Sequence, residues 1–323
     1  MITTLLKPAR AAMLAVAISA LCAPAAFAAA PLAKTPAPGY FRLMLGDFEV
    51  TALSDGTIEL PMNKLLTNTT PEKVDRALKK AFLKSPLETS FNAYLINTGN
   101  KLVLVDGGAG KLFGSPNLGQ MLANLKASGY QPEQVDEIYL THMHVDHVGG
   151  LSVDGQAVFP NAVVRAAKHE SDYWLSPENL ARAPADQKGF FEGAVASMTP
   201  YVKAGKYLPF EGDVEFSPGL RSSARPGHTA GHTSYVVESR GQKLVLIGDL
   251  VHVGAVQFAE PNVTIAFDTN AKEAAATRRK AFAEAARSGD LIGAAHLSFP
   301  ALGHVRASGK AFEWLPVNYT QMH

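Results

Sequence analysis

The sequence predicts an α+β fold in which two mixed β-sheets pack face to face and carry helices on their outer faces. Runs typical of β-strands alternate with helical stretches, and they do so in two halves of similar build. Several strand-like runs end directly in His or Asp, so polar side chains would gather on loops at one end of this sandwich. The chain after the N-terminal segment, about 290 residues, is long enough for one large domain.

The N-terminal segment has the features of an export signal. Lys7 and Arg10 precede an apolar stretch, Ala11 to Cys22, that is too short to remain in a bilayer. Ala26-Phe27-Ala28 then fits a small-x-small cleavage site. A membrane anchor or a buried N-terminal helix is the alternative. We expect a periplasmic protein divided into a signal peptide cleaved near Ala28, a mobile leader and one folded domain, at residues 1–28, 29–39 and 40–323.

Composition limits the partners and the kinds of metal ligand. Cys22 is the only cysteine, so a chain cleaved after Ala28 has neither a disulfide nor a thiolate ligand, and His, Asp or Glu must hold any metal. The net charge of +1, without a basic stripe, argues against nucleic acid as a partner. We expect a small-molecule substrate and no stable membrane insertion. The oligomeric state stays open, with a homodimer as one option.

In the first half, turn residues separate short strands and two helices. Residues 40–53 predict a strand pair that turns at Gly46-Asp47. Pro71 begins a helix that continues to about Leu83, because apolar residues recur at helical spacing. The remaining predicted elements are strands at 91–96 and 102–105 around a turn at 97–100, a helix at 118–127 that ends near Gly129, and a strand at 135–140.

The second half repeats this arrangement. Its clearest element is a helix over 271–286, rich in Ala, Lys, Arg and Glu and followed by Gly289. Residues 182–188 are polar and contain Pro, which indicates an irregular loop. The other predicted elements are a strand at 163–166, helices at 169–175 and 190–202, strands at 214–216, 220–223, 234–238 and 244–247, and a final strand at 291–295.

The loop from Thr141 to His147 is the strongest functional signal. It places three imidazoles and a carboxylate within six residues, directly after a strand. Residues two apart in an extended segment point the same way, so His142 and His144 can bind one ion. Where the chain turns, Asp146 and His147 can face a second ion. Imidazole and carboxylate suit zinc or a similar first-row ion. The alternative is a surface loop that happens to be rich in His.

Three downstream positions repeat the pattern of a strand that ends in one candidate ligand. The Gly-rich stretch 225–232 can turn sharply and present His228, while two buried strands end in Asp249 and His296. A single His or Asp after a strand means little. Together with the His-rich loop, these residues predict that several strand ends converge on one metal site.

The seven candidate ligands together resemble those of the metallo-β-lactamase fold superfamily, and the match spans nearly the whole chain after residue 28. The resemblance implies an αβ/βα sandwich with two divalent ions, for which zinc is the expected metal. His142, His144 and His228 would hold the first ion. Asp146, His147 and His296 would hold the second, and Asp249 would bridge both. Asp106, within the matching segment 104–108, would support the ligands from behind.

Further segments resemble the methyl parathion hydrolase family and its dihydrocoumarin and aryl-lactone hydrolase relatives. The resemblance assigns a leaving-group pocket to Phe113, Trp174 and Phe190, which would otherwise be interpreted as core residues. Aromatic walls suit a flat leaving group such as a phenolate. The matching segments are 45–48, 54–57, 131–136, 296–300 and 316–319.

The chain departs from the phosphotriesterase pattern at positions expected to rim this pocket. Leu65 replaces an Arg, His252 replaces a Leu, and Ile265 and Phe267 also differ. The loop before Gly189 is one residue shorter. These differences count against efficient phosphotriester hydrolysis. His252 could polarise a lactone carbonyl or protonate a phenolate, although a packing role is the alternative.

We therefore expect a dinuclear metal hydrolase that opens aryl lactones or cleaves aryl esters by attack of a metal-bridging hydroxide. Two ions lower the pKa of a shared water, and Asp146 or Asp249 could pass a proton to the leaving group. Weak organophosphate triesterase activity would accompany this reaction. The alternatives are a true phosphotriesterase, an acyl-homoserine lactonase, and a non-catalytic metal- or ligand-binding protein.

Overall fold

The computed structural model describes residues 30–319, and both large sheets lie in one compact unit that begins at Ala37. The predicted signal peptide lies outside the described residues. Within residues 30–319, no helix has both the length and the apolar character needed to cross a membrane.

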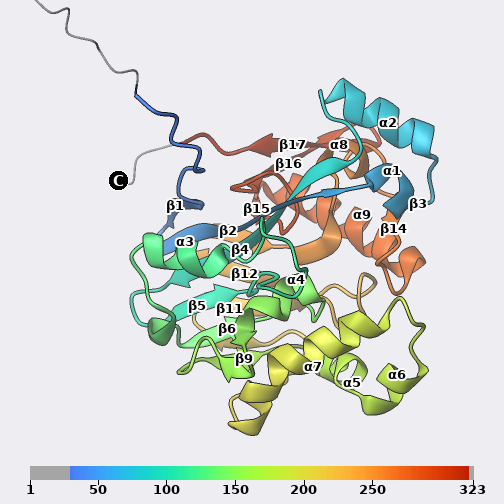
Figure 1. The fold of residues 1–323 in the computed structure, drawn as a ribbon. Helices are drawn as coiled ribbons and strands as arrows, with labels where there is room; N and C mark the ends of the chain where they lie inside the picture. The colour runs from blue at the N-terminus through green and yellow to red at the C-terminus, as the bar shows by residue number, and fades with distance from the viewer. Residues whose placement is uncertain (1–29, 320–323) are drawn as a thin grey trace, which may run out of the picture. The chain divides into compact units, whose positions relative to one another are not determined.

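The first sheet contains six strands, of which the last three run parallel and the others antiparallel. Its strands in spatial order are β1 (Tyr40–Leu45), β2 (Phe48–Leu60), β4 (Leu87–Asn97), β5 (Leu102–Val105), β6 (Glu137–Tyr139) and β9 (Val163–Arg165). The parallel strands β5 and β6 end at the same edge of the sheet, which is where the His-rich loop begins (Figure 1).

The second sheet contains seven strands, and only β13 and β15 pair in parallel. In spatial order they are β10 (Glu215–Ser217), β11 (Leu220–Ala224), β12 (Thr233–Ser239), β13 (Gln242–Leu246), β15 (Leu291–Gly293), β16 (Leu302–Ser308) and β17 (Ala311–Pro316). Two small pairs complete the strands: β3 (Leu66–Thr67) with β14 (Thr264–Ile265), and β7 (Ser152–Val153) with β8 (Gln156–Ala157).

Three hydrophobic clusters define the layers. One lies between the sheets, where Tyr94 and Val103 of the first meet Tyr235 and Leu244 of the second. A second cluster packs helices on the outer face of the first sheet, and a third packs a helix on the second. These helices are α3 (Met121–Ala127), α5 (Lys168–Trp174) and α7 (Lys188–Lys203) on the first sheet, and α9 (Ala271–Ser288) on the second. The predicted α+β sandwich is confirmed.

Five further α-helices are present among the described residues. They are α1 (Met62–Leu65), α2 (Pro71–Lys80), α4 (Val145–Val148), α6 (Pro177–Arg182) and α8 (Gly254–Gln257). Pro71 begins α2 as predicted, with Thr70 as its N-cap. The helix ends three residues before the predicted Leu83, because Phe82 adopts a left-handed conformation with φ 59°.

The last part of the chain differs from the prediction. The strand predicted at 291–295 is not the final one, since β16 and β17 follow it and complete the second sheet. The residues of β16 beyond Val305 are mostly exposed. Exposed strands have little apolar patterning, so periodicity gives only a weak signal for them.

Candidate metal centre

The first group of candidate ligands lies where the backbone changes from extended to helical. His144 has extended angles, with φ −65° and ψ 153°, and is the N-cap residue of α4. The two residues that follow Val145 therefore lie on the first turn of a helix, while His142 precedes the bend. This local change of direction lets one short loop direct side chains into two neighbouring groups of candidate ligands.

The other candidate ligands come from the second sheet. His228 follows β11, Asp249 lies in a short turn after β13, and His296 follows β15. Gly227, beside His228, has φ 131°, and a Cβ there would lie 2.3 Å from the backbone nitrogen of Ala274 in α9. Only glycine therefore allows the loop to approach α9 so closely.

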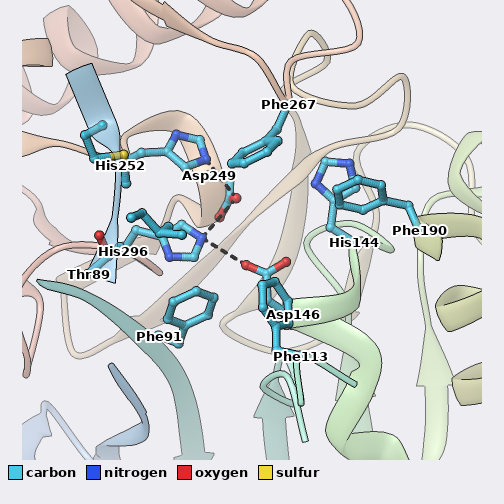
Figure 2. Close-up of a pocket in the computed structure, with 12 residues that line it drawn as sticks. Thr89, Phe91, Phe113, His144, Asp146, Phe190, Asp249, His252, Phe267 and His296 are labelled. Carbon is cyan, nitrogen blue, oxygen red and sulfur yellow. Dashed lines mark hydrogen bonds and ion pairs between the residues drawn. The ribbon is translucent and has the colours of Figure 1, made fainter. Parts of the chain in front are cut away.

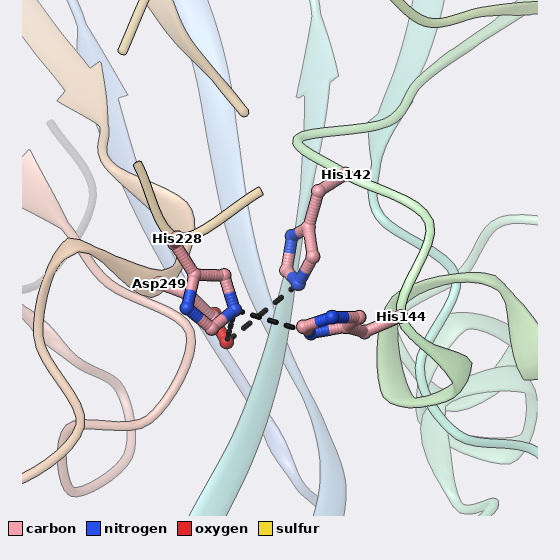
Figure 3. A group of neighbouring side chains, drawn as sticks. All are labelled: His142, His144, His228 and Asp249. Carbon is pink, nitrogen blue, oxygen red and sulfur yellow. Dashed lines mark hydrogen bonds and ion pairs between the residues drawn. The ribbon is translucent and has the colours of Figure 1, made fainter. Parts of the chain in front are cut away.

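These side chains converge in two groups that share Asp249, and the ligand atoms of each group lie within 4.8 Å of one another. In the first group, drawn in Figure 3, His142 and His228 point Nε2 toward Asp249 Oδ2, at 3.7 and 3.3 Å, while His144 Nδ1 lies 3.1 Å from His228 Nε2. In the second group, His147 Nε2 lies 3.1 Å from Asp249 Oδ1 and His296 Nε2 lies 3.1 Å from Asp249 Oδ2. The groups are His142, His144, His228 and Asp249, and Asp146, His147, His296 and Asp249.

The chemistry of these groups fits a dinuclear metal site. Within residues 30–319, Nε2 of His142, Nε2 of His147 and Oδ1 of Asp249 are buried without a hydrogen bond, although the last two atoms lie 3.1 Å apart as an ion pair. Leaving one such atom unpaired costs about 1–3 kcal/mol, so this arrangement is unfavourable unless cations satisfy the atoms. Nitrogen and carboxylate donors suit zinc, but they also accept other first-row ions.

Electrostatics keeps only part of the ligand set in the forms that bind cations. Burial lowers the pKa of His142 and His144 well below the ordinary value, so both imidazoles are neutral. Burial alone would raise the pKa of Asp249, but the surrounding histidines, above all His296 and His147, hold it well below its usual range. Neutral imidazole and ionised carboxylate are the states required for metal binding. Burial alone would lower the pKa of His147, His228 and His296, but Asp249 and other nearby carboxylates raise it, so these three rings must release a proton when a cation binds.

Two carboxylates orient the ligand rings. Asp106 Oδ2 lies 2.9 Å from His147 Nδ1, while its Oδ1 accepts a hydrogen bond from the Thr141 backbone at 2.8 Å. Asp268 Oδ1 lies 2.8 Å from His228 Nδ1. Carboxylates behind metal-binding histidines fix the ring orientation. The sequence indicated Asp106 but not Asp268, because forty residues separate Asp268 from His228 and no short motif links them.

His232 and His304 lie outside both ligand groups. His232 is buried, and its Nε2 accepts a hydrogen bond from the Asp249 backbone nitrogen at 3.1 Å. His304 is exposed, with Nδ1 lying 3.0 Å from the Gly289 carbonyl oxygen. His232 therefore helps to hold Asp249 from behind, whereas His304 lies on the surface.

An aromatic pocket opens beside the two ligand groups (Figure 2). Its volume of about 130 Å³ is similar to that of a cavity that binds benzene, about 150 Å³. His252 lies on the wall, with its ring stacked on His296 at 5.1 Å and its Nε2 lying 3.1 Å from Asp249 Oδ2. The lining residues are Leu60, Met62, Thr89, Phe91, Phe113, His144, Asp146, Phe190, Asp249, His252, Phe267 and His296.

Three residues that the sequence suggested for this pocket do not line it. Trp174 is buried in the core and packs edge-on against His144 at 5.0 Å, so it supports the wall from behind. Leu65 and Ile265 belong to a core cluster that shares Met62 and Phe267 with the pocket wall, but neither of them lines the pocket itself. Sequence reasoning missed Phe91, which packs edge-on against His296 at 4.9 Å. Because Phe91 lies in a buried strand, the sequence indicates a core residue and does not indicate that Phe91 lines the pocket.

Comparison with known proteins identifies a matching family and solved structures of similar fold. The model of the metallo-beta-lactamase superfamily matches residues 89–296. A structure described as hydrolase AbOPH in the beta lactamase superfamily is 39% identical, with a TM-score of 0.84, and the alignment covers 89% of this chain and 100% of that one. A dizinc quorum-quenching lactonase, AidC, is 25% identical, with a TM-score of 0.76 and coverage of 88% and 99%.

The curated relatives match a shorter part of the chain. An N-acyl homoserine lactonase from Bacillus sp. is 29% identical over 125 residues, which is 38% of this chain and 41% of the relative. A second, from Bacillus cereus, is 28% identical over the same share of each chain. The match thus spans about two fifths of these relatives' length.

Proposed function

Because this chain belongs to the metallo-beta-lactamase superfamily, we propose that it is a dinuclear metal-dependent hydrolase that opens aryl lactones or cleaves aryl esters. The observation that carries this proposal is the set of four phenylalanines beside the two ligand groups. An aromatic pocket of this size favours a flat, apolar leaving group over a highly charged one.

Different residues of the pocket can perform different steps of ester hydrolysis. When bound, two divalent ions would act as a Lewis-acid pair that makes water reactive at neutral pH. Burial would raise the pKa of Asp146, on the pocket wall, but His147 and His296 hold it well below its usual range, so the ionised carboxylate can accept a proton from the attacking water and pass it to the leaving oxygen. His252 can donate a hydrogen bond to the substrate carbonyl. The phenylalanines surround the leaving ring and exclude water.

An acyl-homoserine lactonase is the second candidate. The curated relatives and AidC, which are described as such lactonases, favour it. In this proposal a lactone ring occupies the same pocket and an alkyl chain replaces the aromatic group. A phosphotriesterase is a third candidate, because several segments resemble those of the methyl parathion hydrolase family.

A substrate panel on the zinc-loaded protein tests these alternatives. We expect kcat/KM to be highest for dihydrocoumarin, lower for an N-acyl homoserine lactone and lowest for methyl parathion. A preference for the homoserine lactone would favour the second candidate, and a preference for methyl parathion the third. Zinc-loaded protein that hydrolysed none of the three would instead support a non-catalytic binding protein.

We also propose that the chain is exported to the periplasm, with residues 1–28 as a cleaved signal peptide and 29–39 as a leader before the hydrolase domain. The basic and apolar pattern of residues 7–28 supports this proposal. N-terminal sequencing of the protein from a periplasmic fraction should give Ala29 as the first residue. A mature chain that began with Met1 would contradict it.

A further inference from the structure

Glu170 is a fully buried acid that the proposed reaction does not use. It lies on α5, with no exposed side-chain surface. Its two carboxylate oxygens accept hydrogen bonds from two different loops. Oε2 accepts from the backbone nitrogen of Met143 at 3.0 Å, and Oε1 accepts from that of Gly231 at 2.8 Å.

Both loops carry ligands of the first group. Met143 lies between His142 and His144, and Gly231 lies three residues after His228. These loops follow strands of different sheets, and one backbone hydrogen bond joins the segments beside them, from the Thr233 nitrogen to the Thr141 carbonyl oxygen at 2.9 Å. A carboxylate that accepts one N–H from each loop joins them through a rigid planar group.

Two further contacts show how closely α5 is fitted to these loops. A Cβ on Gly231 would lie 2.8 Å from the Glu170 backbone nitrogen and 3.1 Å from its Oε1. One turn along the helix, the Trp174 ring packs edge-on against His144 at 5.0 Å. The helix therefore contacts both loops by hydrogen bonds and one ligand ring directly.

The second ligand group has different supports. Asp106 orients His147, and the carbonyl oxygen of Ser90 lies 3.1 Å from Nδ1 of His296. Glu170 makes no hydrogen bond to either of these histidines among the described residues. A change at Glu170 should therefore act on one group and leave the other intact.

We propose that Glu170 is a positioning residue that sets the spacing of His142, His144 and His228, and thereby the affinity of the first metal position alone. This inference rests on the proposed metal centre but not on the identity of the substrate. Glu170→Gln keeps the size of the side chain but places an amide NH₂ against one of the two backbone donors. Gly231→Ala pushes the same carboxylate away from the His228 loop without removing it.

The test measures zinc at each position after extraction with a graded series of chelator concentrations. Anomalous diffraction gives the occupancy of each position, and thermal unfolding of the metal-free proteins gives their stability. For both variants we expect the first position to lose affinity about tenfold, the lower end for groups that support metal ligands, with the second unchanged. Asp106→Asn is the comparison variant and should weaken the second position more than the first, because Asp106 contacts His147 directly but reaches His142 only through Thr141 Oγ1.

Each other outcome contradicts the proposal. Equal weakening of both positions, or no change at either, would mean that Glu170 acts only as part of the general scaffold. The same conclusion follows if both variants fail to fold under metal-free conditions in which the wild type folds. A wild-type protein that bound no zinc would overturn the metal centre itself, independently of any lactone assay.

Discussion

Among single side chains, His252 has the most direct link to the proposed reaction. Its Nδ1 is buried without a partner, while its Nε2 lies 3.1 Å from Asp249 Oδ2. His252→Phe keeps a ring to stack on His296 but removes both nitrogens. We expect kcat for dihydrocoumarin to fall about a hundredfold, since one positioned acid–base group contributes about 10²–10⁴, with zinc content unchanged.

Steady-state kinetics and metal analysis of the same preparation check this prediction. His304→Phe is the control, because it removes an exposed imidazole that belongs to neither ligand group. An unchanged kcat in the His252 variant would assign this side chain to packing.

Phe190 tests whether the pocket recognises aromatic rings. It is partly exposed and lies 5.1 Å from His144 and 6.3 Å from Phe267, measured between ring centres. Phe190→Leu keeps apolar volume but removes ring stacking, which is worth about 0.5–1.5 kcal/mol. KM for an aryl lactone should rise by up to about tenfold, while KM for an aliphatic lactone stays constant. Equal changes for both substrates would argue against aromatic recognition.

The candidate ligands and the pocket differ in how far the sequence predicts them. His142 to His147 form a dense local motif, and each later ligand follows a strand, so chemistry and spacing indicate them together. A pocket wall has no such signature. Trp174 and Phe91 are both buried aromatics in regular elements, and only the fold decides that Phe91 faces the pocket while Trp174 lies behind it.

At the scale of elements, Asp55 of β2 anchors the segment that carries Phe113. Its carboxylate accepts hydrogen bonds from the backbone nitrogens of Ala109, Gly119 and Met121, on both sides of that segment. Burial raises the pKa of Asp55 from 3.8 to about 6, although these three donors oppose the shift. The folded protein therefore holds this proton more tightly than the unfolded chain does.

Because protonation of Asp55 is linked to folding, the higher pKa in the folded state determines how the stability of the protein changes with pH. Because the folded pKa is the higher one, the stabilising contribution is complete below pH 3.8 and is lost as the pH rises through about 6. Asp55→Asn cannot titrate, so its Tm should change less than that of the wild type across this interval. Its mismatched amide should also lower Tm overall and raise KM, because the Phe113 segment loses an acceptor.

Thermal unfolding from pH 3.8 to 6 measures the difference in slope. Asp154→Asn, at an exposed turn, is the matched control and should follow the wild type. Parallel Tm curves for wild type and Asp55→Asn would show that Asp55 does not titrate in this range.

Among the elements, α9 is the one that the sequence predicts best. Asn270 caps its start and Gly289 ends it in a left-handed conformation, which are both local signals. The end of α2 at Lys80 coincides with the left-handed backbone of Phe82, a residue type that gives no signal for it, and the strands β16 and β17 depend on their pairing in the sheet. When residues distant in the sequence determine which strands pair, the local sequence pattern gives only a weak indication of those strands.

At the scale of the whole molecule, the candidate metal centre connects the two sheets. The His-rich loop follows β6 of the first sheet, while His228, Asp249 and His296 follow strands of the second. Bound ions would therefore cross-link the sheets at one edge of the core between them. Since metal binding to the folded state alone adds stability, ion removal should loosen both sheets together.

We expect a chelator to lower the Tm of the wild type in a single cooperative transition, and added zinc to restore it. Ions at one hundred times their Kd would stabilise the fold by about 2.7 kcal/mol for each site. Asp249→Asn removes a carboxylate oxygen shared by both ligand groups, so its Tm should respond much less to chelator. Calorimetry with and without chelator measures both responses. If the wild type unfolded at the same temperature in both conditions, or if Asp249→Asn kept the full shift, the ions would not join the sheets through this carboxylate.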